Sequence, residues 1–234
     1  MNNASKNNGR ESRTARVIEI IGPAGAGKTT LCQMLVRHTE IVRLENFPDV
    51  RKATDAPFFI LNGLQLIPGL IRIYHPNSRQ LTRREFAWMS ILNGWSAILR
   101  RETNDGDKVI ILDQGPLYLF AEMRVFGPEY LRQNSAERFW QNLYDRWMTT
   151  LSMVVYLDAT DEVLFDRIRS RQQEHIVKTE PSTVVYKFLD RYRAEYAYLL
   201  SIFTANMGNL KVLRCDSGKQ SLQDIANQLL AEVN

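Results

Sequence analysis

The chain has 234 residues, of which 44% are hydrophobic and 24% are charged, as in ordinary soluble proteins with a substantial core. Its 30 basic and 26 acidic residues leave a net charge of +4, which suits an anionic small molecule and argues against a nucleic-acid partner. The two cysteines lie far apart and form no CxxC pair, which argues against a disulfide framework or a zinc site and favours a reducing, cytoplasmic compartment.

The first 15 residues are polar and contain no apolar segment, so they predict a disordered tail rather than a secretory signal. Polar residues, proline and glycine interrupt the most apolar stretch, residues 58–74. A membrane span needs about 20 predominantly apolar residues, so we expect none here. The alternative is an accessory protein in which residues 58–74 lie at a membrane interface.

Apolar, β-branched runs of strand length alternate along the chain with segments of helical periodicity. Such continuous runs are typical of strands buried on both faces of a parallel sheet. The predicted strands are residues 17–21, 40–44, 108–113, 153–158 and 210–215. The predicted helices are residues 28–38, 81–101, 136–150, 160–173, 182–204 and 219–232. This order predicts an α/β, three-layer P-loop NTPase fold with a five-stranded parallel sheet, in one domain over residues 16–234.

Residues 22–29, GPAGAGKT, match the phosphate-binding pattern GxxxxGK[ST] at every fixed position. Glycines let backbone N–H groups approach phosphate oxygens, and the helix that follows directs its N-terminal dipole at the same anion. We expect Lys28 to act as a point charge at the β- and γ-phosphates and the Thr29 hydroxyl to be a magnesium ligand. The predicted nucleotide-binding set is Gly22, Pro23, Ala24, Gly25, Ala26, Gly27, Lys28, Thr29 and Thr30.

Two predicted strands end in an aspartate that is suited to orienting a magnesium ion. Asp113 is followed by a Gln-Gly-Pro turn that exposes the strand end, where ligands bind in open α/β sheets. Asp158 precedes an acidic helix start, which predicts a helix-capping role for this residue. The pattern therefore favours Asp113 as the second magnesium ligand.

Glu45 follows the second predicted strand and is expected at the same sheet edge as the phosphate-binding residues. There it either accepts the proton of an attacking hydroxyl or serves as a solvated loop residue or a helix cap. Arg167 and Arg171 are four residues apart and are predicted to share a helix face, from which Arg169 points away. This pair predicts a lid around residues 165–182 that neutralises charge on phosphoryl oxygens, with a solvated basic face as the alternative.

In the order and spacing of these motifs, the chain from about residue 16 onward resembles P-loop nucleoside and nucleotide monophosphate kinases, especially the deoxynucleoside kinase and thymidylate kinase branch. The resemblance implies that Glu45 acts on the acceptor hydroxyl and that Arg167 and Arg171 are lid arginines. It also implies that the helix at 81–101 lines the acceptor pocket. The chain departs from the family at Gln114, where an arginine usually helps to hold the acceptor, and in lacking a proline directly after Glu45.

The sequence therefore predicts an ATP-dependent small-molecule kinase that uses Mg²⁺. Its predicted catalytic residues are Lys28, Glu45, Asp113, Arg167 and Arg171. The expected acceptor is a hydroxyl or phosphate compound such as a nucleoside or nucleotide, bound between residues 45–75 and the helix at 81–101. A regulatory ATPase that acts on a macromolecular partner is the alternative, and the resemblance is compatible with a homodimer.

Overall fold

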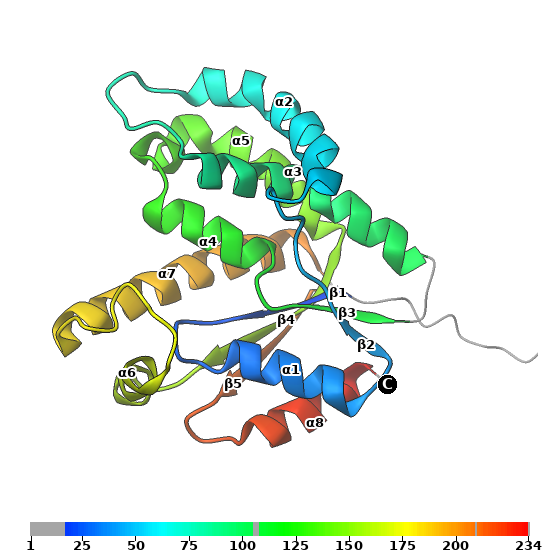
Figure 1. The fold of residues 1–234 in the computed structure, drawn as a ribbon, viewed down its shortest axis with the longest axis vertical. Coiled ribbons are helices and arrows are strands. Elements are labelled where there is room, and N and C mark those ends of the chain that lie inside the picture. Colours follow the sequence, from blue (N-terminus) through cyan, green and yellow to red (C-terminus); the bar gives the residue numbers. More distant parts are fainter. Residues whose placement is uncertain (1–16, 105–107, 209, 234) are drawn as a thin grey trace, which may run out of the picture.

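Five parallel strands form one sheet in the order β2-β3-β1-β4-β5 (Figure 1). The computed structural model describes residues 17–104, 108–208 and 210–233, and the predicted disordered tail lies outside them. The strands are β1 (Val17–Ile21), β2 (Val42–Leu44), β3 (Val109–Leu112), β4 (Leu151–Asp158) and β5 (Lys211–Asp216). This sheet confirms the predicted α/β fold.

The strand β1 lies at the centre of the sheet, since both β3 and β4 pair with it in parallel. All five of its residues are buried, and four of them are Val or Ile. That composition suits a strand that is covered on both faces. Because the strands run in parallel, the loop after β1 and the ends of β3 and β4 meet at one carboxyl edge, where open α/β sheets bind their ligands.

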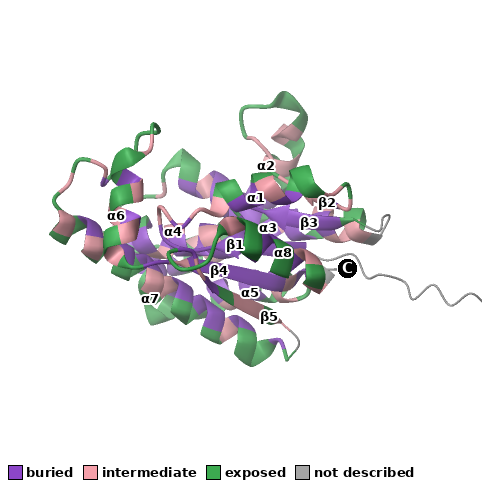
Figure 2. Cartoon of the chain, turned by 90° about the horizontal axis from the view of Figure 1, so that it is seen from below, coloured by how far each residue is buried: buried purple, intermediate pink, exposed green. Residues whose placement is uncertain are grey.

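Helices cover both faces of the sheet (Figure 1). On one face lie α1 (Lys28–His38) and α8 (Leu222–Val233), and on the other lie α3 (Arg83–Asn104), α4 (Pro116–Phe126), α5 (Glu137–Met148) and α7 (Ser182–Asn206). The helix α6 (Asp161–Ser170) contacts α7, and three short 3₁₀ helices complete the order: η1 (Ala53–Asp55), η2 (Glu129–Arg132) and η3 (Asn134–Ala136). The core therefore forms two clusters, one on each side of the sheet. Strands β1, β3 and β4 are mostly buried (Figure 2).

The interrupted apolar stretch forms a further helix, α2 (Ala56–Ile73), which packs on α3. The interrupting residues make this contact: Asn93 Nδ2 donates to the Asn62 carbonyl oxygen at 3.3 Å and to Gln65 Oε1 at 3.0 Å. Gly94 leaves room for Asn62, because a Cβ at that position would collide with the amide. Several apolar side chains of α2 consequently face outward, namely Ile60, Leu61, Leu64, Ile67 and Ile71.

By length and composition alone, Ala53–Ile73 is the one helical segment among residues 17–104, 108–208 and 210–233 that is long and apolar enough to cross a membrane. Only 22% of its most apolar window is buried inside the protein. The expectation that the chain contains no membrane span therefore stays a prediction.

Candidate active site

The phosphate loop, residues 22–30, joins the central strand β1 to α1 at the carboxyl edge of the sheet. Gly27 adopts a left-handed conformation, with φ 94° and ψ 13°, directly before the first turn of α1. Glycine is favoured there because side chains with a Cβ rarely adopt positive φ. At Gly22 a Cβ would collide with the carbonyl oxygen of Leu157 on β4. The loop therefore sits directly against the sheet edge, with the N-terminus of α1 open toward an anion.

Lys28 folds back over the phosphate loop. Its Nζ donates hydrogen bonds to the carbonyl oxygens of Gly22 at 2.9 Å and Pro23 at 3.0 Å. Burial lowers the pKa of Lys28 to about 8, and the nearby Asp113 opposes this shift. A bound polyphosphate would favour the charged ammonium and so raise the pKa again. Lys28 thus lies against the predicted phosphate-binding loop, and its role at the phosphates stays a prediction.

Thr29 and Asp113 lie together although 84 positions separate them in the sequence. The Thr29 hydroxyl donates to Asp113 Oδ2 at 2.7 Å. The other carboxylate oxygen, Asp113 Oδ1, is buried and has no hydrogen-bond partner among the described residues. An orphaned carboxylate oxygen beside a threonine hydroxyl fits Mg²⁺, which prefers oxygen ligands and binds through one or two carboxylates plus phosphates.

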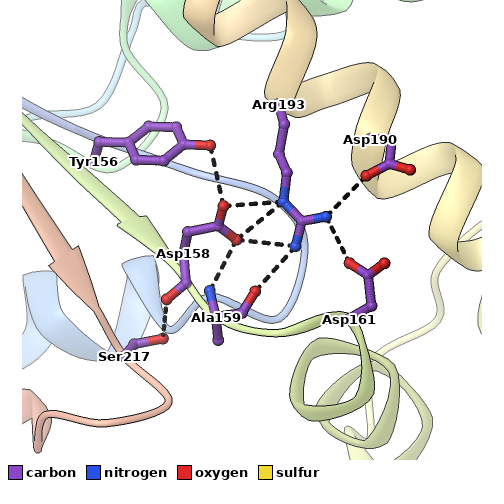
Figure 3. A network of polar contacts seen from close by, with 7 residues as sticks. All are labelled: Tyr156, Asp158, Ala159, Asp161, Asp190, Arg193 and Ser217. Carbon is purple, nitrogen blue, oxygen red and sulfur yellow. Dashed lines mark hydrogen bonds and ion pairs between the residues drawn. The ribbon is translucent and has the colours of Figure 1, made fainter.

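Asp158, the alternative magnesium ligand, binds an arginine instead. Arg193 of α7 donates from Nε to Asp158 Oδ2 at 2.9 Å and from Nη1 to Asp161 Oδ1 at 2.5 Å (Figure 3). Asp158 also accepts from the Ala159 amide, and the residue at the start of α6 is Thr160, with no side-chain cap. The prediction that Asp158 caps this helix is therefore wrong, because its carboxylate binds Arg193, whose guanidinium links β4 to α6 and α7.

The predicted lid arginines lie at the cavity but do not share a helix face as expected, because α6 ends at Ser170 and leaves Arg171 beyond it. Arg167 is held firmly, since its guanidinium donates to the carbonyl oxygens of Gly25 at 3.3 Å and Ser217 at 2.8 Å. Among the described residues, the Arg171 guanidinium makes two long contacts, both at 3.4 Å, to backbone oxygens of residues 173 and 174. Arg169 points away from Arg167, as expected, and donates to the carbonyl oxygen of Glu180.

Glu45 lies outside this group. Its carboxylate forms an ion pair with Arg43 at 3.1 Å, and Arg43 also pairs with Glu102 of α3. Burial raises the pKa of Glu45, Arg43 lowers it and Glu102 raises it. Glu45 is not among the described residues that line the cavity beside Lys28. The role predicted for it in proton transfer remains a prediction.

The phosphate loop opens into a cavity of about 630 Å³, within the usual range for small-molecule sites. Beyond the loop and the lid arginines, its walls come from α4, α7 and the segment after α6. They include side chains that the sequence analysis did not select for a site: Gln114, Tyr118, Glu122, Phe188, Tyr192 and Tyr196. His175 lies against the Phe188 ring, and burial, Arg171 and Lys28 lower its pKa to about 4, so it is neutral at physiological pH.

The unusual turn Asp113-Gln114-Gly115-Pro116 is explained by a buried carboxyl group below it. Glu19 of β1 is fully buried and accepts from the backbone amides of Leu117 and Tyr118, each at 2.9 Å. Burial raises the pKa of Glu19 to about 8, while these amides lower it. This contact begins α4, a helix that apolar periodicity did not predict. The signal for it was Pro116, since proline favours the first helical position.

Residues 18–184 match the protein family described as AAA domain, more than half of the chain. The chain belongs to this family. The solved structures that resemble this AAA domain protein include deoxyadenosine kinase from M. mycoides, with TM-score 0.54 and 16% identity over 93% of this chain and 98% of that one. Thymidylate kinase from Candida albicans gives a TM-score of 0.55 and 16% identity over 94% and 91% of the two chains.

A further structure of the M. mycoides enzyme, with dATP bound, gives a TM-score of 0.51 and 15% identity over 92% of this chain and 99% of that one. No curated protein matches this AAA domain chain in sequence. The two kinases therefore confirm the P-loop kinase-like fold, and the identity is too low to carry over their substrates.

Proposed function

We propose that this protein is an ATP-dependent small-molecule kinase that transfers the γ-phosphoryl group to a hydroxyl or phosphate acceptor. One observation carries the proposal: the phosphate loop and the walls on α4 and α7 line one continuous cavity. A nucleotide held on the loop would thus face a second, aromatic-lined space in which an acceptor can lie. Nucleosides and nucleotides belong to the acceptor class considered, since the kinases of similar fold are named for them.

The chain's own residues suit the donor side of this reaction. Backbone amides of the phosphate loop and the Lys28 ammonium would bind the β- and γ-phosphates. Arg167 and Arg171 line the same cavity and would neutralise charge on the transferred group. Thr29 and Asp113 would hold Mg²⁺, which supplies charge neutralisation at the phosphates when bound. Phosphoryl transfer depends mostly on positioning and electrostatics, so these few groups are sufficient.

The test measures ADP formation by the full chain with ATP and Mg²⁺, with and without a panel of hydroxyl and phosphate acceptors. We expect turnover to depend on an acceptor and Lys28→Ala to reduce it by at least about 100-fold, as loss of one preorganised charge-stabilising donor does. Lys187→Ala is the matched control, because Lys187 is an exposed lysine on α7 that does not line the cavity.

A regulatory ATPase that works on a macromolecular partner predicts a different result in the same assay. Hydrolysis would then proceed without any acceptor and would rise with a protein partner. Acceptor-independent hydrolysis across the whole panel would refute the kinase proposal.

A further inference from the structure

The cavity beside the phosphate loop has two halves of opposite chemistry. The half at the loop and lid carries the cations Lys28, Arg167 and Arg171. The half on α4 and α7 carries Glu122, surrounded by the phenols of tyrosines 118, 192 and 196. None of the described lining residues on α4 or α7 is lysine or arginine. An acceptor bound in this second half would therefore meet a carboxylate and phenols.

Glu122 is held in a fixed orientation at this wall. The Tyr192 hydroxyl donates to Glu122 Oε1, and Tyr192 itself is only 6% exposed. Burial raises the pKa of Glu122, and hydrogen bonds from Tyr192 and Tyr118, together with the charges of Arg84 and Lys28, oppose that rise. Glu122 thus lies within electrostatic reach of Lys28, the residue that marks the phosphate position.

We propose that Glu122 is the carboxylate that receives the acceptor hydroxyl, and that the acceptor is an alcohol without a phosphate group. This inference rests on the proposed kinase function. In the step, the acceptor oxygen forms a bond to the γ-phosphorus of ATP while the bond from that phosphorus to the β–γ bridging oxygen breaks. ADP leaves with the bridging oxygen, and the hydroxyl proton passes to a carboxylate oxygen of Glu122.

The alternative base, Glu45, is engaged elsewhere. It pairs with Arg43 and is not among the described lining residues of the cavity. Glu122 and Lys28 line the same cavity, so an acceptor hydroxyl hydrogen-bonded to Glu122 would share that cavity with a γ-phosphate bound at Lys28. The placement of the two carboxylates therefore favours Glu122.

The charge of the second half decides the acceptor class. A phosphate monoester carries roughly −1.5 to −2 charges at pH 7, and a neighbouring carboxylate repels it. Gln114, at the turn after β3, offers no charge to compensate. Arg84 of α3 lies over the Trp88 ring, at 4.4 Å from its centroid, and its charge lowers the pKa of Glu122, but it is not among the described lining residues. An alcohol donates its hydroxyl to Glu122 without this repulsion.

The test compares Glu122→Gln with wild type in the ADP assay, using nucleosides, hexoses, polyols and amino alcohols, each paired with its monophosphate. We expect turnover with at least one free alcohol, little with its monophosphate, and a loss of kcat of about 10²- to 10⁴-fold in Glu122→Gln, as for a general base. The KM for ATP and the affinity for a non-hydrolysable ATP analogue should stay within about threefold of wild type, because the donor half is unchanged.

Three variants separate this role from a structural one. Glu129→Gln is the matched control, since Glu129 is exposed on η2 just beyond α4, and it should keep wild-type kcat. Tyr192→Phe removes the hydroxyl that orients Glu122 and should lower kcat less than Glu122→Gln does. Glu45→Gln tests the competing assignment and should lower kcat less than Glu122→Gln does. Melting temperatures of all variants check that each one is folded.

The outcomes distinguish the two proposals. Acceptor-dependent turnover that survives Glu122→Gln, falls mainly in Glu45→Gln, or prefers the monophosphates overturns the inference and leaves the kinase proposal standing. A panel in which no acceptor raises ADP formation overturns the kinase proposal, and the inference fails with it.

Discussion

Replacing Gly115 by alanine tests whether the buried Glu19 shapes the turn after β3. A Cβ at residue 115 would lie 2.5 Å from Cδ, 2.8 Å from Cγ and 2.9 Å from Oε1 of Glu19, all shorter than ordinary van der Waals contact. The backbone itself accepts alanine, since its φ of −98° and ψ of −159° are extended. A Gly→Ala change at a compatible backbone stabilises by about 0.4–1 kcal/mol through the unfolded state. The steric conflict thus predicts a lower free energy of unfolding for Gly115→Ala, and the backbone preference predicts a higher one.

We expect the steric conflict to change the free energy of unfolding more than the backbone preference does. Overpacking in a core costs about 1–3 kcal/mol. If Glu19 moves away instead, the amides of Leu117 and Tyr118 lose their acceptor, at about 1–3 kcal/mol for each buried unpaired group. We therefore expect Gly115→Ala to lower the free energy of unfolding by about 2 kcal/mol, which lowers Tm by about 4–8 °C in a chain of this size.

Urea and thermal denaturation at pH 7 measure this effect, with Gly208→Ala as the matched control. Among the described residues beyond its chain neighbours, no heavy atom lies within 4 Å of a Cβ built at Gly208, so that variant should be neutral or slightly stabilised. In a Glu19→Ala background the cost of Gly115→Ala should vanish, because the atoms it would meet are absent. A Gly115→Ala protein as stable as wild type would show that Glu19 does not restrict this turn.

Three further predictions concern the carboxyl groups and the lid. Because the folded-state pKa of Glu19 is raised from 4.5 to about 8, the folded state binds more protons than the unfolded state at pH values between these two. Unfolding free energy should therefore fall as pH rises from about 5 to 8, by up to about 1.4 kcal/mol per unit; urea titrations should show a flatter profile in Glu19→Gln. Thr29→Ala and Asp113→Asn should each raise the Mg²⁺ concentration for half-maximal turnover by roughly 10-fold or more, and an unchanged Mg²⁺ dependence would remove that residue from the metal site. Arg167→Met should lower kcat by about 100-fold, whereas Arg169→Met, on the same helix but turned toward Glu180, should behave as wild type; equal effects would contradict a lid role for Arg167.

The donor side of the candidate site could be predicted because its geometry is local. Residues 22–30 form the phosphate loop within one strand-loop-helix unit, so their spacing alone determines where Lys28 and Thr29 lie. Asp113 could also be predicted, since parallel strands end at one edge of the sheet and the phosphate loop starts there. In the structure its carboxylate accepts a hydrogen bond from the Thr29 hydroxyl at that edge.

The acceptor side could not be predicted because it depends on the packing of distant helices. Glu122 and Tyr192 are 70 positions apart and meet only because α4 lies on α7. From the sequence, Tyr192 is an ordinary residue of a predicted helix, and Glu122 lies in no predicted helix or strand. Glu45 does lie at the sheet edge, but its orientation depends on Arg43 and on Glu102 of α3. Arg171 differs because α6 ends at Ser170, three residues before the predicted end at residue 173, and apolar periodicity places helix ends only approximately.

The contact of Glu19 with the turn at Gly115 also has an evolutionary consequence. The two positions are 96 residues apart, yet only a residue without a Cβ fits above the Glu19 carboxyl group. A homologue that gains a side chain at position 115 should therefore have lost the glutamate at position 19, and the two substitutions should occur together in descent. A shorter residue at 19 would leave the first amides of α4 to be satisfied by a side chain from the turn itself. Aligned homologues can thus reveal which chains keep this turn, and with it the same start of the helix that carries Glu122, without a structure of each one.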